Sequence, residues 1–351
     1  MPKLAFIVAT VVALTFATTA LGGANTPPKV LNVCADAGKC YTSIQAAIDA
    51  AADGDTVKIA AGTYLGSLSI SKNISVVGAG SSLTTISVAP PDAGCCIRYR
   101  TVLIDTGATV TVKGVTVTHI YGGGGGILNR GALKLRESNI TTNPEGFCAC
   151  GGQGQTWPAD NPREGGGIFT SGPLTLVNST VQFNLGEFRG GGIYNDGATV
   201  KLFNSTVSNN FAATFFGGAH GGGIWNGGTM TLYDSSVSDN TASAALNGGG
   251  SGGGIVNGAV ATLVLRSSTV TGNQADFGGG IDNAGTVSLY DTTITRNFAG
   301  GHLGGTITPN PGGGILNSGV LNVFDSVISG NTPNDCSQTS SSLPYYADCS
   351  L

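Results

Sequence analysis

Short runs of alternating apolar and polar residues recur along the chain from about residue 124 onward. Each unit opens with Gly-Gly-Gly-Ile, continues with a run such as Leu-Thr-Leu, and ends with a run such as Ser-Thr-Val-Ser before an asparagine. Alternation with a period of two residues is typical of half-buried β-strands. The seven units are anchored at Ile127, Ile168, Ile193, Ile224, Ile255, Ile281 and Ile315.

The spacing of these isoleucines, 25 to 41 residues with an average of about 31, is typical of a solenoid. Three short strands per unit predict a coil in which each unit forms one turn. A propeller blade would need four strands, and a leucine-rich repeat would need a tighter leucine pattern. We therefore predict an all-β fold, a single right-handed parallel β-helix. Two less regular turns, around residues 68–86 and 104–120, bring the prediction to about nine turns.

Asparagines recur at two fixed places in the unit. One column, in which Thr170 replaces one amide, consists of Asn129, Asn195, Asn226, Asn257, Asn283 and Asn317. The other column closes each unit and consists of Asn143, Asn184, Asn210, Asn240, Asn273, Asn297 and Asn331. Stacked strands lie about 4.8 Å apart, so identical amides can form hydrogen bonds along a column. We interpret both columns as structural ladders.

Residues 41–64 predict a helix that covers the first turn. Thr42 and Gln45 have the spacing of a capping box. Ile44 and Ile48 lie on one apolar face of the helix that would follow. Since the end of a solenoid needs a cover, we expect this helix to act as an N-terminal cap.

The first residues have the pattern of a secretory signal. Lys3 provides a positive charge, residues 4–21 form an apolar run, and small residues end it. A run of about 18 apolar residues is almost long enough to span a bilayer. This one is rich in alanine and threonine, however, so we favour cleavage between Ala20 and Ala24. The predicted division is a signal peptide at 1–24, a cap at 25–65, the β-helix at 66–335 and a disulfide-closed tail at 336–351.

Eight cysteines in an exported chain favour disulfides. They occur as the close pairs Cys34 and Cys40, Cys95 and Cys96, Cys148 and Cys150, and Cys336 and Cys349. We expect the first and last pairs to close local loops at the two ends. Because adjacent cysteines do not easily bond to each other, we expect the second pair to be cross-linked to the third. Zinc is the weaker interpretation, because no histidine accompanies these cysteines at ligand spacing.

Charge is sparse, with 10% charged residues and a formal net charge of −4. This balance gives no electrostatic basis for binding nucleic acid or an anionic membrane surface. The chain has 58 glycines together with 40% hydrophobic residues, so the glycines must belong to ordered structure. No second apolar span follows the first one. We expect a monomer that is secreted or held at the cell surface, with no membrane attachment after signal cleavage.

The segment SIQAAIDAAADGDTVKIAAGTY at residues 43–64 resembles the opening of pectin-lyase-like right-handed β-helix proteins. The units resemble repeats of bacterial secreted and surface β-helix proteins, including the polymorphic outer-membrane group. The resemblance covers about residues 30–335 and implies the fold. It does not specify a function, because this fold carries lyases, hydrolases, esterases and non-catalytic adhesins. It also implies a substrate groove along the first, glycine-rich strand of each turn.

The motifs of particular enzymes in that superfamily are missing from the chain. It has no Asp-Asp dipeptide and no Asn-Thr-Asp of the kind that polygalacturonases carry. The calcium-binding aspartates and paired arginines of pectate lyases have no counterpart, because glycine occupies the corresponding strand. We therefore expect no metal and no cofactor, and a Ca²⁺ site has no support.

The units differ most between the closing asparagine and the next glycines. These inserts span residues 144–164, 185–189, 211–220, 241–251, 274–277 and 298–311. All of them leave the coil at the same corner, so we expect them to form one wall of a groove.

The residue after each anchor isoleucine is expected to face outward, because side chains alternate along a strand. This column reads Leu128, Phe169, Tyr194, Trp225, Val256, Asp282 and Leu316. We predict Phe169, Tyr194, Trp225 and Asp282 as substrate-binding residues, since an exposed aromatic row suits stacking on sugar rings. The alternative is a small satellite core in which the overlying loops bury the three rings.

The residue before each glycine run forms a second column. It reads Glu164, Arg189, His220, Ser251, Phe277 and Pro311. We predict Glu164, Arg189 and His220 as catalytic residues, because a carboxylate, a guanidinium and an imidazole on adjacent turns can bind an acidic sugar or transfer protons. His220 is the best single candidate, since its charge changes near neutral pH. The alternative is an ion pair between Glu164 and Arg189 beside a histidine without a role.

Two hypotheses for the function follow. The first is a secreted or cell-surface protein that binds a polysaccharide or cell-surface glycan and, if it is an enzyme, acts as a polysaccharide lyase or glycoside hydrolase. The second is a non-catalytic structural or adhesion protein. Glycine in the first strand removes the side chains that known lyases use, which weakens the enzyme hypothesis. The aromatic and titratable residues on the loop side favour binding.

Overall fold

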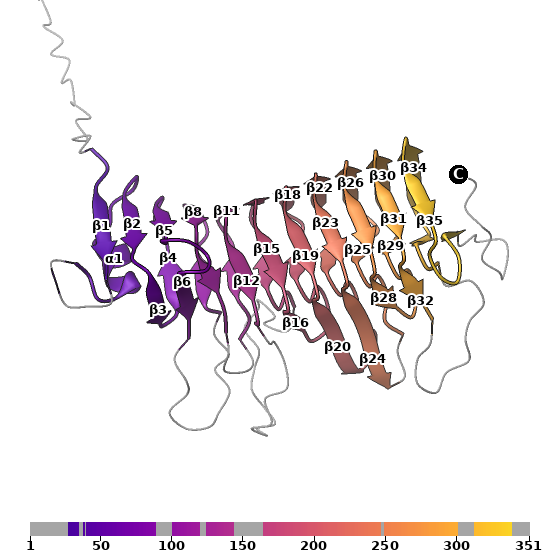
Figure 1. The fold of residues 1–351 in the computed structure, drawn as a ribbon, viewed down its shortest axis with the longest axis horizontal. Helices are drawn as coiled ribbons and strands as arrows, with labels where there is room; N and C mark the ends of the chain where they lie inside the picture. The colour runs from indigo at the N-terminus through magenta and orange to yellow at the C-terminus, as the bar shows by residue number, and fades with distance from the viewer. Residues whose placement is uncertain are drawn as a thin grey trace, which may run out of the picture.

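Each repeating unit forms three short strands, because alternation directs its apolar side chains to one face and its polar side chains to the other. One unit contains β17 (Ile193–Asn195), β18 (Thr199–Phe203) and β19 (Thr206–Ser208) in sequence. Every strand pairs in parallel with its counterpart in the next turn, as β17 does with β21 (Ile224–Asn226). The result is an elongated parallel β-helix (Figure 1). The computed structural model describes residues 27–34, 38, 40–88, 100–119, 124–143, 164–246, 249–300 and 312–338.

Three long parallel sheets form the walls of the coil. Sheet A has eleven strands, in the order β1 (Val30–Val33), β2 (Thr56–Ile59), β5 (Ser75–Val77), β8 (Thr109–Lys113), β11 (Ala132–Arg136), β14 (Leu174–Val177), β18, β22 (Thr229–Tyr233), β26 (Thr262–Arg266), β30 (Thr286–Tyr290) and β34 (Val320–Phe324). Sheet B has ten strands, in the order β3 (Gly62–Leu65), β6 (Thr84–Ser87), β9 (Thr116–Val117), β12 (Asn139–Thr141), β15 (Thr180–Gln182), β19, β23 (Ser236–Ser238), β27 (Thr269–Thr271), β31 (Thr293–Thr295) and β35 (Val327–Ser329). Sheet C has ten strands, in the order β4 (Leu68–Ile70), β7 (Val102–Ile104), β10 (Ile127–Asn129), β13 (Ile168–Thr170), β17, β21, β25 (Ile255–Asn257), β29 (Ile281–Asn283), β33 (Ile315–Asn317) and β36 (Cys336–Gln338).

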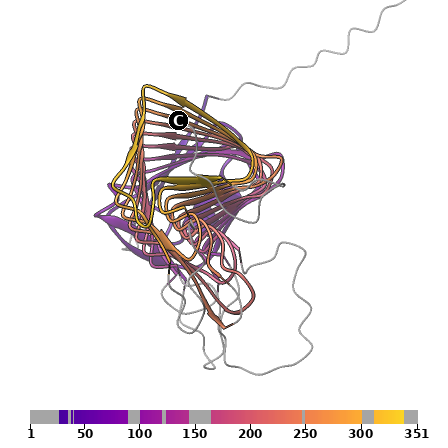
Figure 2. The same cartoon turned by 90° about the vertical axis from the view of Figure 1, so that its right-hand side faces the viewer.

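A fourth, smaller sheet lies beside these walls, where the sequence predicts only variable inserts. Sheet D has five strands, in the order β16 (Leu185–Gly186), β20 (Phe211–Phe216), β24 (Thr241–Leu246), β28 (Gln274–Ala275) and β32 (Phe298–Ala299). Viewed along the axis, the strands of successive turns superpose in the walls, and the strands of sheet D project from one side (Figure 2). The prediction of three strands per turn is therefore correct for the walls, but five of the turns have a fourth strand, in sheet D.

The prediction of about nine turns is too low, because the walls contain ten or eleven strands each. Part of the segment assigned to the cap joins the coil itself, as β1, β2 and β3. At the other end, β36 adds a strand to sheet C beside β33. The single parallel β-helix with an N-terminal helix is confirmed.

The interior of the coil is filled by the apolar side chains of all three walls. The anchor isoleucines are buried, as are the inward-facing leucine, isoleucine and valine side chains of sheets A and B between the two end turns. Helix α1 (Ile44–Ala50) covers the first turn with Ile44 and Ile48 buried. Its N-cap is Ser43, whose hydroxyl accepts a hydrogen bond from the backbone N–H of Ala46. The expected capping box of Thr42 and Gln45 is therefore wrong, because the third residue after Ser43 is Ala46 and the Gln45 amide bonds to Asp49 and to the backbone of Ser69.

Both asparagine ladders are confirmed. In the column that closes each unit, the amide nitrogen donates to the amide oxygen of the next turn at 2.8 to 2.9 Å, from Asn143 through to Asn331. The carboxylate of Asp335 accepts the last of these bonds at 3.0 Å. In the other column the same bond runs from Asn195 to Asn317, and Asn129 donates to the Thr170 hydroxyl.

The glycine triplets are buried and pack against backbone, so they do not leave a bare outer surface. A Cβ on Gly222 would lie 2.4 Å from the carbonyl carbon and oxygen of Thr241, the first residue of β24. A Cβ on Gly223 would lie 2.7 Å from the carbonyl oxygen of Gly254 and 2.9 Å from the amide of Asn240. Glycine and the closing asparagine therefore occur together because the asparagine amide fills the space that a side chain would need.

Three cysteines lie in the described part of the chain. Cys34 and Cys40 form a disulfide, as predicted. Cys336 is also disulfide-bonded, and its partner lies outside the described residues. The remaining predicted disulfide cysteines, Cys95, Cys96, Cys148, Cys150 and Cys349, lie outside the described residues, as does the signal peptide predicted at 1–24. Within the described ranges, no helix combines the length and hydropathy needed to cross a membrane.

Candidate functional site

Two columns of side chains run next to each other where each turn enters sheet C. The residues before the glycine triplets are in register from turn to turn, pairing Glu164 with Arg189, Arg189 with His220 and His220 with Ser251. We call Glu164, Arg189, His220 and Ser251 the polar column. The residues after the anchor isoleucines are also in register, pairing Phe169 with Tyr194 and Tyr194 with Trp225. We call Phe169, Tyr194 and Trp225 the ring column.

A fold in the glycine triplet brings the two columns together. The backbone of Gly221 has a φ of 67°, which favours glycine. A Cβ at this residue would lie 2.3 Å from the carbonyl oxygen of Ile224 and 2.9 Å from the backbone nitrogen of Trp225. The chain therefore turns back on itself, so that His220 and Trp225 lie on the same side of one turn.

The ring column is a stack rather than an open row of ring faces. The rings of Phe169 and Tyr194 have centroids 5.1 Å apart, and those of Tyr194 and Trp225 lie 4.6 Å apart with planes 10° from parallel. Phe169 is 6% exposed and Tyr194 is 5% exposed, while Trp225 is only partly buried. The expectation of three exposed rings is therefore wrong for Phe169 and Tyr194, because each ring covers its neighbour at the spacing of the turns. A ligand has access to Trp225 alone among the three.

Glu164 forms the N-terminal end of the polar column and is buried. The guanidinium of Arg100 donates to the backbone carbonyl of Glu164 at 2.6 Å and to that of Gly165, which fixes this end of the column. Burial raises the pKa of the Glu164 carboxyl, and a hydrogen bond from Tyr194 and the charge of Arg189 partly oppose that rise. Burial raises the pKa of the Tyr194 hydroxyl, and the charge of the Glu164 carboxyl and its hydrogen bond raise it further.

Arg189 is the solvent-exposed cation of the column. Its Nη1 lies 3.3 Å from the Oε1 of Glu164, and its side chain is 43% exposed, against 12% for Glu164. The guanidinium carbon lies 5.4 Å from the centre of the Trp225 ring, within the range of a cation–π contact. Arg189 therefore joins the polar column to the accessible ring of the ring column.

Ser251 links His220 to Asp282 and was not predicted as a functional residue. Its hydroxyl lies 2.8 Å from the Nδ1 of His220 and forms a hydrogen bond with the Asp282 carboxyl. Burial lowers the pKa of His220, and the positive charge of Arg189 lowers it further. Burial raises the pKa of Asp282, against the opposing effect of the Ser251 hydrogen bond. In the sequence, the register of the repeat already placed Ser251 one turn after His220 and one turn before Asp282. That position was the signal from which its role could have been predicted.

The two carboxyl groups of the site are too far apart to act as a pair. Glu164 precedes β13, and Asp282 lies in β29, four turns further along sheet C. Four turns span about 19 Å at the usual strand spacing. Paired carboxyls in glycosidases lie about 5 to 9.5 Å apart. In the described part of the chain, no three His, Cys, Asp or Glu side chains gather closely enough to hold a metal ion.

The structure therefore brings Glu164, Arg189 and His220 together with Trp225, and it connects Asp282 through Ser251. The catalytic and substrate-binding roles assigned to these residues stay predictions. The implied groove along the glycine-rich strand is wrong, since the triplets are buried against Thr241 and its counterparts in sheet D. The accessible surface lies beside the glycines, over Arg189 and Trp225.

Replacing His220 with asparagine should flatten the pH dependence of stability between pH 7 and pH 5. Because the folded state lowers the pKa of His220, the unfolded state binds more protons as the pH falls through about 6.5, which is the usual value for histidine. The wild-type protein should lose stability over that range, and His220→Asn should lose less. Urea unfolding at both pH values measures this difference. Equal losses in the two proteins would contradict the assignment.

The coordinates are similar to those of known β-helix proteins. A pectate lyase, Pel9A, superposes with a TM-score of 0.52 at 13% identity, over 87% of this chain and 79% of that chain. A pectin methylesterase from Aspergillus niger has a TM-score of 0.47 at 13% identity, over 92% of this chain and 93% of that chain. The carrot pectin methylesterase has a TM-score of 0.47 at 12% identity, over 84% and 87% of the two chains.

The likeness to Pel9A shows the pectin-lyase-like right-handed parallel β-helix fold. At this level of identity it shows the fold alone. No model of a protein family matches the chain. No curated protein sequence is significantly similar to it.

Proposed function

We propose that this is a secreted or cell-surface β-helix protein that binds a polysaccharide over Arg189 and Trp225. A carboxylated sugar unit would place its carboxylate on Arg189 and the apolar face of its ring on Trp225. A protein whose name describes action on pectate has the same fold, which supports a polysaccharide as the ligand. The proposal moves the binding surface from the buried glycine strand to the columns beside it.

The contact between Arg189 and Trp225 carries the proposal. A guanidinium binds a carboxylate through two parallel N–H···O bonds, and such charge-assisted bonds are stronger than neutral ones. Arg189 lies 3.3 Å from Glu164 and forms a hydrogen bond with Tyr194, while 43% of its side chain stays exposed. A ligand site combines an apolar surface with a few placed polar groups. The half-buried ring of Trp225 provides the first and Arg189 the second.

The titratable groups bear on whether a bound glycan would also be cleaved. Hydrolysis by a pair of carboxyls does not fit Glu164 and Asp282, which are four turns apart. His220 has a lowered pKa and is therefore neutral at pH 7, as a general base must be. If the protein is an enzyme, its chemistry is proton abstraction by His220 from a sugar held at Arg189, as in a polysaccharide lyase.

Replacing Arg189 with alanine should weaken glycan binding by about tenfold or more, because a hydrogen bond to a charged group contributes about 1.5 to 3 kcal/mol. A glycan array with the wild-type protein identifies the ligand, and isothermal titration with that glycan measures the loss. Arg296→Ala is the matched control, since Arg296 is an exposed arginine in the turn after β31 of sheet B. A reducing-end assay on the same glycans detects cleavage.

Binding by Arg189→Ala at the affinity of the wild-type protein would refute this site. If no glycan binds the wild-type protein and none is cleaved, the alternative function is favoured, that of a non-catalytic structural or adhesion protein. The buried, mutually stacked Phe169 and Tyr194 would then be a satellite core, and the pair of Glu164 and Arg189 a structural ion pair.

A further inference from the structure

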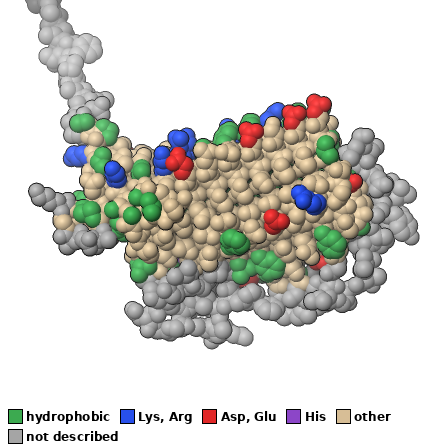
Figure 3. All heavy atoms as spheres, viewed as in Figure 1, with side chains coloured by type: hydrophobic (Ala, Val, Ile, Leu, Met, Phe, Trp, Pro, Cys, Tyr) green, Lys and Arg blue, Asp and Glu red, His purple; other side chains and the backbone are tan. Residues whose placement is uncertain are grey.

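The basic side chains are distributed unevenly over the walls of the coil. Within the described residues, every lysine or arginine that lies in a strand belongs to sheet A: Lys58, Lys113, Lys134, Arg136, Lys201 and Arg266. The described strands of sheet A contain no aspartate or glutamate. The described strands of sheet B carry no charged residue at all. In Figure 3 the charged side chains gather mainly along the upper edge, and the broad face below it is largely uncharged.

These six side chains point outward, because each of them follows a residue that points into the core, and Lys58, Lys134 and Lys201 also precede one. Lys134 lies between the buried Leu133 and Leu135, and Lys201 lies between the buried Val200 and Leu202. We call the outward surface of sheet A the basic face. The chain as a whole has a formal net charge of −4, but the basic face is positively charged.

The cations lie in two columns along the axis, one to four turns apart: Lys134 and Lys201 in one column, and Lys58, Lys113, Arg136 and Arg266 in the other. In the strand order of sheet A, β2, β8, β11, β18 and β26 carry them, with two on β11. From Lys134 on β11 to Lys201 on β18 the step is two turns, which is about 9.5 Å. This step is close to the length of a disaccharide, so a linear glycan lying along the coil meets these two cations one disaccharide apart.

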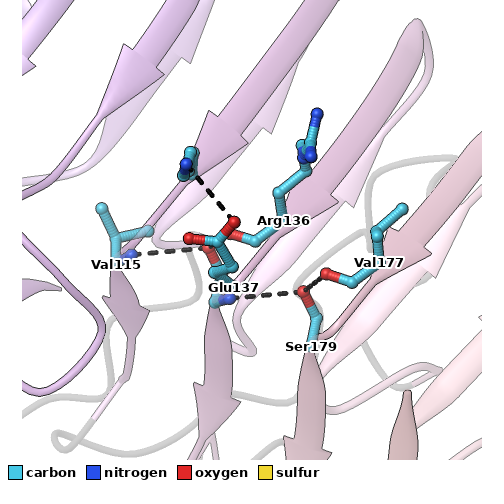
Figure 4. Close-up of polar contacts among 7 residues, drawn as sticks. Val115, Arg136, Glu137, Val177 and Ser179 are labelled. Carbon is cyan, nitrogen blue, oxygen red and sulfur yellow. Dashed lines mark hydrogen bonds and ion pairs between the residues drawn. The ribbon is translucent and has the colours of Figure 1, made fainter. Parts of the chain in front are cut away.

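Most of these cations are free to bind an anion. Lys113 is paired, with its Nζ 3.3 Å from the Oε1 of Glu137, and the side chain of Arg136 points away from Glu137 (Figure 4). The other five have no carboxylate within salt-bridge distance among the described residues. The guanidinium of Arg266 lies 4.0 Å from the centre of the Tyr290 ring, which is itself stacked on Phe324 at 4.9 Å. This stacking fixes the plane of Arg266 and leaves its N–H edge available.

We propose that the basic face binds a linear acidic polysaccharide that runs along the axis of the coil, independently of the site at Arg189. Charge complementarity identifies the ligand class, and the two-turn step from Lys134 to Lys201 places one cation at every second unit of a linear chain of acidic sugars. Duplex DNA carries one charge per about 1.7 Å. The acidic residues that follow the strands of sheet A, namely Glu137, Asp234, Asp291 and Asp325, would repel so dense a charge. A glycan with sparse charges can avoid that edge.

The test uses the whole protein with Arg189→Ala already introduced, so that binding at the site over Arg189 and Trp225 does not contribute to the result. The probe is alginate, a linear polymer of carboxylated sugars, with neutral dextran as its control. We expect the Arg189→Ala protein to bind alginate and not dextran, more weakly at high salt. Adding Lys134→Gln, Lys201→Gln and Arg266→Gln should weaken binding by about tenfold or more, since each exposed ion pair contributes little alone.

The matched control is the pair Lys29→Gln and Arg296→Gln, two exposed cations outside the basic face, which should leave the affinity unchanged. Thermal unfolding should be nearly the same for all of these variants, because surface changes usually alter stability by about 0.5 kcal/mol or less. Unchanged alginate binding by the triple variant would overturn the proposal. Equally tight binding of duplex DNA or of phosphatidylserine vesicles at the same salt concentration would overturn it as well.

Discussion

Replacing Asn240 with alanine is expected to lower the free energy of unfolding by about 3 to 5 kcal/mol. Asn240 lies fully buried in the middle of the ladder that closes each unit. Its amide oxygen accepts bonds from the backbone nitrogen and the side chain of Asn210, both at 2.9 Å. Its amide nitrogen donates to the carbonyl of Val207 at 3.0 Å and to Asn273 at 2.9 Å. Alanine would remove all four of these bonds and leave the buried backbone N–H of Asn210 without its acceptor. The Asn210 amide would keep its bond to the carbonyl of Val181, and the Asn273 oxygen would keep its bond from the backbone nitrogen of Asn240.

Urea unfolding of the variant and of the wild-type protein measures this loss. The matched control is Asn322→Ala, which removes one partly buried hydrogen bond, to Ser288 on the outer face of sheet A. The control should lose about 1 kcal/mol or less. Similar losses for the two variants would show that the buried ladder does not stabilise the coil more than a surface amide does.

Replacing Gly222 with alanine is expected to cost about 3 kcal/mol or more, or to prevent folding. The added Cβ would lie 2.4 Å from the carbonyl of Thr241 and 2.6 Å from the carbonyl oxygen of Gly253. The Thr241 carbonyl belongs to β24 of sheet D, and the Gly253 carbonyl accepts a hydrogen bond from the backbone nitrogen of Gly223 at 3.1 Å, so neither can move without breaking backbone hydrogen bonds between turns. Urea unfolding of the variant, or its yield of soluble protein, tests this.

A second glycine separates the effect of space from that of backbone conformation. Gly197 has a φ of 78° and nothing within 4 Å of the position of an added Cβ. Gly197→Ala should cost only the conformational penalty, about 1 to 2 kcal/mol. If Gly222→Ala were as stable as Gly197→Ala, the triplets would not be packed as described, and a ligand could approach them after all.

The fold could be predicted from the sequence because its repeat is local. Each turn contains the same alternation, so stacking the turns in register places residues such as Ile224 and Asn226 beside their counterparts in the next turn. The number of turns was predicted less accurately than the fold, because the first turns lack the Gly-Gly-Gly-Ile opening. Sheet D was missed since its strands lie in the variable inserts and contain few large aliphatic residues at alternating positions, as in β20 (FAATFF) and β24 (TASAAL), which pair with each other and with β16 and β28.

The candidate site was predicted in its position but not in its exposure. The register placed Glu164, Arg189 and His220 on adjacent turns, as the structure shows. The burial of Tyr194 was predicted only as an alternative, under overlying loops, whereas in the structure rings in the neighbouring turns cover both of its faces. The glycines were interpreted as open surface, whereas their function is to admit Thr241 and Asn240, which lie in the same turn.

The fluorescence of Trp225 during titration with short oligosaccharides tests the central claim most directly. The chain has two tryptophans, so a Trp157→Phe protein reports on Trp225 alone. We predict a saturable change with at least one carboxylated oligosaccharide, and loss of that change when Arg189→Ala is added. A folded Trp157→Phe protein whose fluorescence is unaffected by every carboxylated oligosaccharide would contradict the account. So would a change that persists in full without Arg189.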